Sequence, residues 1–333
     1  MSIAVLYEHP EWFQPLFDEL ERRQLPFIRL HAGELNWSAA EQPNFSLLVN
    51  RMSPSAYLRG NAHAIHATAA FLGYVESYGV SVVNDLQTYR IETSKSAQLD
   101  LFERVGAPYP ATRAINHPEK ALTAVQGLRF PIVVKPNLGG SGAGVTWFNT
   151  LEDLSQAVHT NQLDFGLDRT ALVQEGITSP DKSITRVELI DGEPLYAIRI
   201  TPPAGHGFNL CPADICQEPS NAASAIAPGQ SLGNFCPTKP TMAIEHVNVH
   251  EGMRDVVTTI ARAAGLDVCG VEYIVDERDG QPYVYDVNAL SNFVTNAHEI
   301  LGFDPFVRLV DLIELRWKTA IDSKQVLVAS VSP

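Results

Sequence analysis

The sequence is short of positive charge. Its 333 residues include 24 Lys and Arg against 38 Asp and Glu, which gives a formal net charge of −14 at pH 7. A surface this acidic repels phosphate backbones and anionic lipids, because affinity for both depends on neutralising their charge. We therefore expect no nucleic acid and no membrane among the partners, and an anionic ligand would need a local basic pocket.

Other absences narrow the class further. No apolar run approaches membrane-spanning length, and no basic leader followed by an apolar core opens the chain, so export is not expected. The four cysteines show no CxxC spacing, which in a chain of this length indicates reduced thiols. Low-complexity tracts and solenoid repeats are also missing. The sequence is typical of an ordinary folded protein of the cytoplasm with two or three compact units.

Apolar periodicity predicts a mixture of α/β and α+β structure in three domains. Residues 1–88 alternate short strands with helices, as a small N-terminal α/β domain does. Residues 89–179 form a central domain with a helix over 93–105 and strands over 132–134 and 171–174. Residues 180–333 form a C-terminal domain with two hairpins, a helix over 253–264 and a closing helix near 305–317, and residues 202–240 are expected to be a long loop.

A glycine-rich loop follows the strand at 132–134, in the stretch IVVKPNLGGSGAGV. Its small residues, which would let backbone amides approach an anion, are Gly139, Gly140, Ser141, Gly142 and Gly144. Neither a Walker P-loop nor the Rossmann fingerprint has this spacing. Because Lys135 ends the strand just before the glycines, the pattern suits a mobile lid over a triphosphate, with an ordinary hairpin loop as the alternative.

The hairpin over 268–288 carries two acids. A three-residue turn at 278–280 would set Glu277 opposite Gln281, and therefore Glu272 opposite Asp286, with Asn288 on the same face. Two partly buried carboxylates require a cation or a proton, and two carboxylates with an amide suit Mg²⁺ shared with nucleotide phosphates. A two- or four-residue turn would instead send Asp286 to the opposite face and leave an ordinary solvated hairpin.

With the lysines, the glycine loop and this Glu…Asp-x-Asn hairpin in place, the order of features resembles the ATP-grasp superfamily. Within it, the chain looks most like RimK-type ligases, which attach amino acids such as glutamate to peptide or carrier acceptors. The likeness runs over about residues 1–318. It implies an ATP-grasp fold with a pre-ATP-grasp N-terminal domain, and ATP and Mg²⁺, with Mn²⁺ as a substitute, as cofactors.

The resemblance implies a role for each matching residue. Lys95, in TSKSAQLDLFERVGAPYP, and Lys135, in VVKP, would contact nucleotide phosphate, and Gln174, Glu175 and Ile177 would form the hinge that reads adenine. Arg186 matches the arginine of an Asp-Ile-Arg stretch, and Asp181 would replace the missing acid beside it at the ribose. Arg199, at a strand end, would act in catalysis with Lys135 by steadying the transferred phosphate. The metal ligands would be Glu272, Asp286 and Asn288.

The sequence departs from the family after Asn288, where Ala289-Leu290-Ser291-Asn292-Phe293 replaces the common Pro-Gly. That loop borders the acceptor site in the family. Candidate substrate contacts are Asn292, Asn209 in the long loop, and Arg51. Arg51 follows a strand of the first domain, as Glu8 and His9 do, and the alternative for these three is that they are ordinary loop residues.

The implied reaction joins a small-molecule carboxylate to an amine, on an amino acid or a peptide, through an acyl phosphate. A small-molecule kinase or carboxylase, and a non-catalytic nucleotide-binding regulator, are the alternatives, and a homo-oligomer is compatible with each. His206, Cys211, Cys216 and Cys236 lie near one another in the sequence, but their spacing matches no common zinc pattern.

Overall fold

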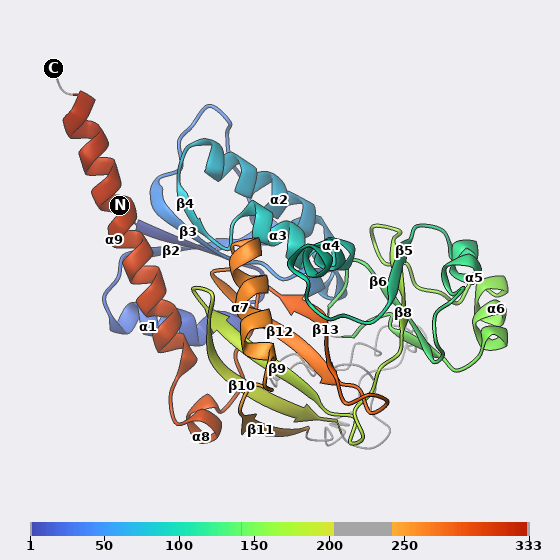
Figure 1. Ribbon diagram of the computed structural model, residues 1–333. Helices are drawn as coiled ribbons and strands as arrows, with labels where there is room; N and C mark the ends of the chain where they lie inside the picture. Colours follow the sequence, from blue (N-terminus) through green and yellow to red (C-terminus); the bar gives the residue numbers. More distant parts are fainter. Residues whose placement is uncertain (1, 141, 203–241, 332–333) are drawn as a thin grey trace, which may run out of the picture.

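Three β-sheets organise the chain in a computed structural model that describes residues 2–140, 142–202 and 242–331, with side chains described as far as Ser323 (Figure 1). Each predicted domain contains one of these sheets. The predicted boundary at residue 88 falls inside helix α3 (Leu86–Glu92), and the boundary at 179 lies between two sheets. The domain division itself stays a prediction.

The N-terminal sheet is parallel, and helices alternate with its strands along the chain. Its strands are β1 (Ser2–Tyr7), β2 (Phe27–His31), β3 (Phe45–Arg51) and β4 (Ser81–Val83), in the order β2-β1-β3-β4. Alternate residues of β1 face opposite cores, because successive side chains on a strand point to opposite faces. Ile3 and Val5 pack with α1 (Gln14–Arg22) and α9 (Pro305–Val331), whereas Ala4 and Leu6 pack with α2 (Ala62–Ser77). Short 3-10 helices η1 (Glu11–Phe13), η2 (Ala32–Glu34) and η3 (Pro54–Arg59) connect these elements.

The central sheet is small and antiparallel. Its strands are β5 (Thr112–Ile115), β6 (Ile132–Pro136), β7 (Thr146–Phe148) and β8 (Ala171–Glu175), in the order β5-β8-β6-β7. Helices α5 (Ala121–Ala124), after η4 (Pro118–Lys120), and α6 (Leu151–His159) cover its apolar face. The Thr150 side chain caps α6, since it accepts a hydrogen bond from the Asp153 amide at 3.1 Å.

The C-terminal sheet is also antiparallel and has five strands in the order β11-β10-β9-β12-β13. These are β9 (Ile184–Ile190), β10 (Glu193–Thr201), β11 (Ala243–Val247), β12 (Val268–Val275) and β13 (Pro282–Asn288). Helix α7 (Met253–Ala264) covers one face, where α3 and α4 (Lys95–Val105) join it, and the other face shares a core with β1, β3 and α9. α8 (Ala297–Leu301) precedes α9, which Figure 1 shows extending past the body of the molecule.

The pairing of Glu272 with Asp286 is confirmed, but the predicted turn is wrong. Asp276 donates its amide to the Gln281 carbonyl at 2.9 Å, so Asp276, and not Glu277, faces Gln281 across a four-residue loop. A β-bulge at Tyr285 then adds one residue to β13 between the Tyr273–Val284 and Glu272–Asp286 pairs. The two one-residue shifts cancel, and Asp286 returns to the face of Glu272.

None of the helices described is both long and apolar enough to cross a bilayer. The predicted loop at 202–240, with the cysteines and His206 considered for zinc, lies outside the described residues except for Pro202.

Candidate active site

A pocket of about 650 Å³ is lined by the central and C-terminal sheets and by segments that follow strands of the N-terminal sheet. The N-terminal side contributes Trp12, Ser53 and Ser55, which follow the carboxyl ends of β1 and β3, where parallel sheets commonly bind ligands. Most of the residues predicted from sequence line the same pocket, although they are spread over some 200 positions. They are Lys95, Lys135, Gly139, Gly140, Gly142, Gln174, Glu175, Ile177, Arg186, Glu272, Asp286, Asn288 and Asn292.

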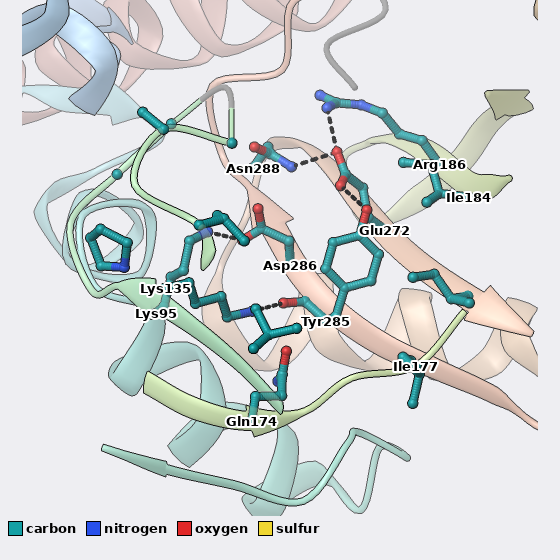
Figure 2. Close-up of a pocket in the computed structure, with 18 of the residues that line it drawn as sticks. Lys95, Lys135, Gln174, Ile177, Ile184, Arg186, Glu272, Tyr285, Asp286 and Asn288 are labelled. Atoms are coloured by element: carbon teal, nitrogen blue, oxygen red, sulfur yellow. Dashed lines mark hydrogen bonds and ion pairs between the residues drawn. The ribbon is translucent and has the colours of Figure 1, made fainter. Parts of the chain in front are cut away.

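Three oxygen-bearing side chains converge on one wall (Figure 2). Glu272 of β12 and Asp286 of β13 are paired across the sheet, and Asn288 donates its side-chain amide to Glu272 Oε1 at 3.2 Å. Burial raises the pKa of Glu272, an effect that Asp286 reinforces and Arg186 opposes. The carboxylate pair therefore disfavours its own full ionisation unless positive charge is supplied.

This donor set fits Mg²⁺. No group of three His, Cys, Asp or Glu side chains able to hold a metal occurs in the described part of the chain. Two carboxylates and one amide leave the remaining positions to water and nucleotide phosphate, as is usual for Mg²⁺ and unusual for zinc.

Two lysines face the carboxylates from the opposite side. Lys95, the first residue of α4, places its Nζ 2.5 Å from Asp286 Oδ1, and Lys135 of β6 donates to the Tyr285 carbonyl at 3.2 Å. The Lys135 side chain is buried, and burial together with the neighbouring Lys95 ammonium lowers its pKa to about 8. Both ammonium groups are placed to receive phosphate oxygens.

Arg186 of β9 completes the charged wall. It donates to Glu272 Oε1 at 2.8 Å, to Glu188 Oε1 at 2.6 Å and to Ser291 Oγ at 2.7 Å. Burial opposes the charge of this arginine, but the carboxylates of Glu188 and Glu272 more than offset burial and raise its pKa. Arg186 is therefore charged at neutral pH.

The glycine loop runs along the pocket and approaches the N-terminal domain. A Cβ at Gly140 would lie 2.9 Å from the Ser55 Cβ, so this contact requires glycine. Gly142 and Gly144 have left-handed φ values of 69° and 73°. Gly144 packs against Pro136 and Asp164 and is not among the residues that line the pocket, and Ser141 lies outside the described residues.

The predicted hinge forms the far end of the pocket. Gln174 donates to Thr112 Oγ1 at 2.8 Å, and Glu175 accepts from the Arg129 amide at 2.9 Å, so both side chains are held by sheet neighbours. Apolar side chains that could flank a planar base line the pocket near this segment, namely Val133, Val145, Ile177 and Ile274. The hinge thus combines side chains that are held by hydrogen bonds with apolar walls.

Besides Gly144, three predicted residues are not brought into the pocket. Asp181 is exposed and uses its carboxylate within its own turn, accepting from Ser179 Oγ and the Ser183 amide at 3.0 Å each, so its expected ribose contact is not supported. Arg199 is exposed on β10 and pairs with Thr185, which places it on the α7 face, opposite Arg186 and Glu272. Its expected role at the transferred phosphate is therefore not supported either.

Arg51 is the third of these residues. Its side chain is fully buried beneath the loop after Asn288 and donates to the Ser291 carbonyl, so it does not contact the cavity directly. Glu8, also at a strand end, is buried and accepts from Arg59 and Asn61. Asn209 lies outside the described residues.

Four pocket or near-pocket residues were missed by sequence reasoning. Tyr285, the bulge residue, donates its hydroxyl to Glu272 Oε2 at 2.6 Å. No feature of the sequence predicts this bulge. Glu188, fully buried, shares the face of Arg186 two residues earlier, and strand alternation could have found it. Glu92, whose pKa burial raises to about 7, and Lys182, in a left-handed conformation at the rim, also line the pocket.

We compared the chain with known proteins by sequence and by structure. No protein-family model matches the chain. The D-alanine–D-alanine ligase of Maridesulfovibrio salexigens is 26% identical over 228 residues, 67% of each chain. The carbamoyl phosphate synthase large chain of Methanothrix thermoacetophila is 28% identical over 233 residues, but the match spans only 19% of that longer protein.

Solved structures resemble the chain along nearly its whole length. The ATP-grasp ligase PsnB, complexed with a phosphomimetic precursor variant, Mg and ADP, has a TM-score of 0.64 at 18% identity over 94% of this chain and 98% of its own. A RimK-domain ATP-grasp protein of Sphaerobacter thermophilus gives 0.61 at 17%, covering 92% and 98%. The D-alanine–D-alanine ligase of Bacillus anthracis, complexed with ATP, gives 0.63 at 16%, covering 97% and 99%.

The chain has the ATP-grasp fold. The ATP-grasp fold and the mixed α/β and α+β fold class expected from sequence are confirmed, and a RimK-domain protein is among the structural neighbours.

Proposed function

We propose that the protein is an ATP-dependent ligase that joins a carboxylate to an amine through an acyl phosphate. The observation that carries this proposal is the convergence of Glu272, Asp286 and Asn288 with Lys95 and Lys135 under a glycine loop, in one pocket. Relatives of the same fold that act on amino acids or peptides support the choice of a ligase, namely a D-alanine–D-alanine ligase and an ATP-grasp ligase complexed with a precursor. An amino acid or short peptide is the substrate class we propose.

The chemistry needs no protein nucleophile. A substrate carboxylate oxygen attacks the γ-phosphorus of ATP, the bond to the β–γ bridging oxygen breaks, and ADP leaves. The amine nitrogen then attacks the acyl carbon, the bond to the phosphate oxygen breaks, and the nitrogen loses a proton as the amide forms. Both steps depend on positioning and charge neutralisation, which is what a pocket built of lysines, an arginine and acids supplies.

Each residue has a defined part in these steps. Glu272, Asp286 and Asn288 would hold Mg²⁺, which neutralises charge on the β- and γ-phosphates when bound. Lys95 and Lys135 bind phosphate oxygens from the other side, and Arg186 fixes Glu272. The glycine loop, at Gly139, Gly140 and Gly142, covers the phosphates and excludes water that would hydrolyse an acyl phosphate. Gln174, Glu175 and Ile177 hold the base, and Asn292 lies at the substrate end.

A substrate screen tests the proposal. ADP release is measured with ATP, Mg²⁺ and panels of amino acids and short peptides, and products are analysed by mass spectrometry. We expect ADP release to depend on both an acid and an amine, with an amide product. Release that needs the acid alone and leaves a stable phosphorylated product would establish the kinase alternative. Release that needs added bicarbonate and leaves a carboxylated product would establish the carboxylase alternative. Nucleotide binding without turnover across the panel would favour a regulatory module.

We further propose that the reaction takes place in the cytoplasm, where its ATP is supplied. The buried Cys269 is a free thiol, as expected in a reducing compartment.

A further inference from the structure

One buried serine behind the pocket connects two arginines from two different sheets. Ser291 is fully buried in the loop that follows Asn288. Its hydroxyl accepts a hydrogen bond from Arg186 Nη2 at 2.7 Å, and its carbonyl accepts one from Arg51 Nη2. Because Arg51 ends β3 and Arg186 lies on β9, the N-terminal and C-terminal sheets meet at this residue.

The burial of the Arg51 guanidinium costs folding free energy. Its side chain is 1% exposed, and its Nε and Nη1 have no hydrogen-bond partner among the described residues. Besides Ser291 it contacts the Phe13 ring, with 5.3 Å between the guanidinium carbon and the ring centroid. Burial lowers its pKa to about 10, so it is still charged at neutral pH. Apolar residues of similar volume usually replace such buried charges without loss of stability, so packing alone does not explain an arginine here.

Arg186 is held in one orientation from several sides. A Cβ at position 270 would lie 2.7 to 2.9 Å from its guanidinium atoms, so Gly270 provides the space that the guanidinium occupies. Its three acceptors are Glu188, Glu272 and Ser291. Of these acceptors, Ser291 also contacts the N-terminal sheet, through its hydrogen bond with Arg51.

The loop that contains Ser291 also shapes the cavity. Leu290 and Asn292, its two neighbours, line the pocket. At the start of the loop, the Ala289 amide donates to Glu92 Oε2, which ties it to α3. A displaced Ser291 would therefore move both the pocket wall and the arginine that pairs with Glu272.

We propose that Arg51 and Ser291 are positioning residues of the metal–nucleotide site. Arg51 fixes Ser291 from behind, and Ser291 fixes Arg186 against Glu272 and holds Leu290 and Asn292 at the cavity. The N-terminal sheet thus acts on nucleotide binding through a residue that does not contact the cavity. This inference rests on the proposed function, since it assigns a role toward Mg²⁺ and nucleotide.

The test is the Mg²⁺-dependent binding of AMPPNP, a non-hydrolysable ATP analogue, measured by titration calorimetry, with thermal unfolding followed in parallel. Ser291→Ala and Arg51→Lys are compared with the full-length wild-type chain. We expect about 10- to 100-fold weaker binding for Ser291→Ala, the range seen when partners behind metal ligands are removed, and a smaller loss for Arg51→Lys, which keeps the charge. Arg51→Met should bind at least as weakly as Ser291→Ala.

Two matched controls separate positioning from stability. Ser46→Ala removes the hydroxyl of a second buried serine, which lies on β3 and donates to the Ser2 carbonyl at 3.4 Å. Arg316→Lys changes an arginine of α9 that contacts Asp191 and Asp267. Neither lies near the pocket, and both should change the unfolding temperature without changing AMPPNP affinity.

The outcomes are distinct. Arg51→Met removes the charge together with the hydrogen bond to Ser291, so the inference is decided by Ser291→Ala and Arg51→Lys. Wild-type affinity in both would overturn it and leave the proposed function intact, as would a lower unfolding temperature with unchanged affinity. A wild-type protein that does not bind AMPPNP with Mg²⁺ would overturn the proposed function itself, and this inference with it.

Discussion

The two hairpins of the C-terminal sheet contain the same irregularity with opposite consequences. In β12–β13, a four-residue loop and a bulge at Tyr285 shift the register in opposite senses, so Asp286 faces the pocket beside Glu272. In β9–β10, a two-residue turn at Asp191-Gly192 joins the strands, and a bulge at Leu195 shifts the register once. Arg199 therefore pairs with Thr185, whereas an unbroken ladder would have set it opposite Ile184, on the face of Arg186.

The difference shows that a single extra residue in a strand separates a carboxylate that faces the pocket from a charge on the surface. Side chains alternate along a strand, so one extra residue reverses the face of everything that follows it until a second shift compensates. Two register shifts precede Asp286 and cancel, whereas a single shift precedes Arg199 and turns it to the other face. The cation next to Glu272 is consequently Arg186, directly across from it on β9, at 2.8 Å.

The largest effect in this comparison should come from Glu272→Gln. Glutamine keeps the size of the side chain but removes the charge that would bind Mg²⁺, so turnover should fall by at least about 100-fold, in line with the role of metal ions in phosphoryl transfer. Steady-state ADP release is the measurement, with thermal unfolding to verify the fold.

The control belongs to the same hairpin. Glu277→Gln removes an exposed carboxylate from the four-residue loop, and it should leave turnover unchanged. Comparable losses in both variants would mean that the hairpin acts through its stability and not through a metal.

The next largest effect should separate the two arginines. Arg186→Lys retains the charge but cannot reach Glu188, Glu272 and Ser291 together, because lysine has a single point of contact. We expect Mg²⁺-dependent AMPPNP affinity to fall by about 10- to 100-fold. Arg199→Lys, on the α7 face, should bind as the wild type does, and a large loss there would contradict the face that the bulge assigns to it.

Much of this site was accessible from sequence because its chemistry follows local patterns. Lys135 stands at the end of an apolar strand before four glycines, and Glu272, Asp286 and Asn288 lie on strands whose apolar residues alternate. The helix cap at Thr150 and the left-handed glycine at Gly265 are likewise local, and the structure has both. These features depend on a few neighbouring residues, and a few neighbours suffice to predict them.

The rest depends on contacts between distant residues. Bulges at Leu195 and Tyr285 are set by the strands they pair with, so the face of Arg199 could not be deduced from its own segment. Asp181 was expected at a ribose, but the turn it sits in takes up its carboxylate. Arg51 was expected at the cavity and lies one residue layer behind it, because the loop after Asn288 folds over it.

A smaller effect should appear in the pH dependence. Lys135 donates to the carbonyl of Tyr285, the bulge residue, and its pKa is lowered to about 8. Phosphate binds the protonated amine, so AMPPNP affinity should be full below pH 8 and should fall as pH rises through 8, by up to about tenfold per pH unit. Calorimetry from pH 6.5 to about 9.5 measures it.

Arginine provides the contrast for this titration, because it stays charged over the whole range. The decline above pH 8 should be absent in Lys135→Arg, whatever its absolute affinity. The same decline in the arginine variant would assign the titration to another group.

The smallest expected effect tests the bulge itself. Tyr285→Phe keeps the ring and the bulge but removes the hydroxyl that donates to Glu272 Oε2 at 2.6 Å. Hydrogen bonds to charged groups are worth about 1.5 to 3 kcal/mol, but Glu272 keeps Arg186 and Asn288 as donors, so the loss in AMPPNP affinity should be about fivefold. Tyr283→Phe, on the same strand, removes an exposed hydroxyl that donates to Asp279 in the loop and should have no effect.

If the two variants behave alike, the bulge serves only to restore the register of Asp286. If Tyr285→Phe alone weakens binding, the bulge also adds a donor to the metal site, which the regular ladder of β13 could not place there.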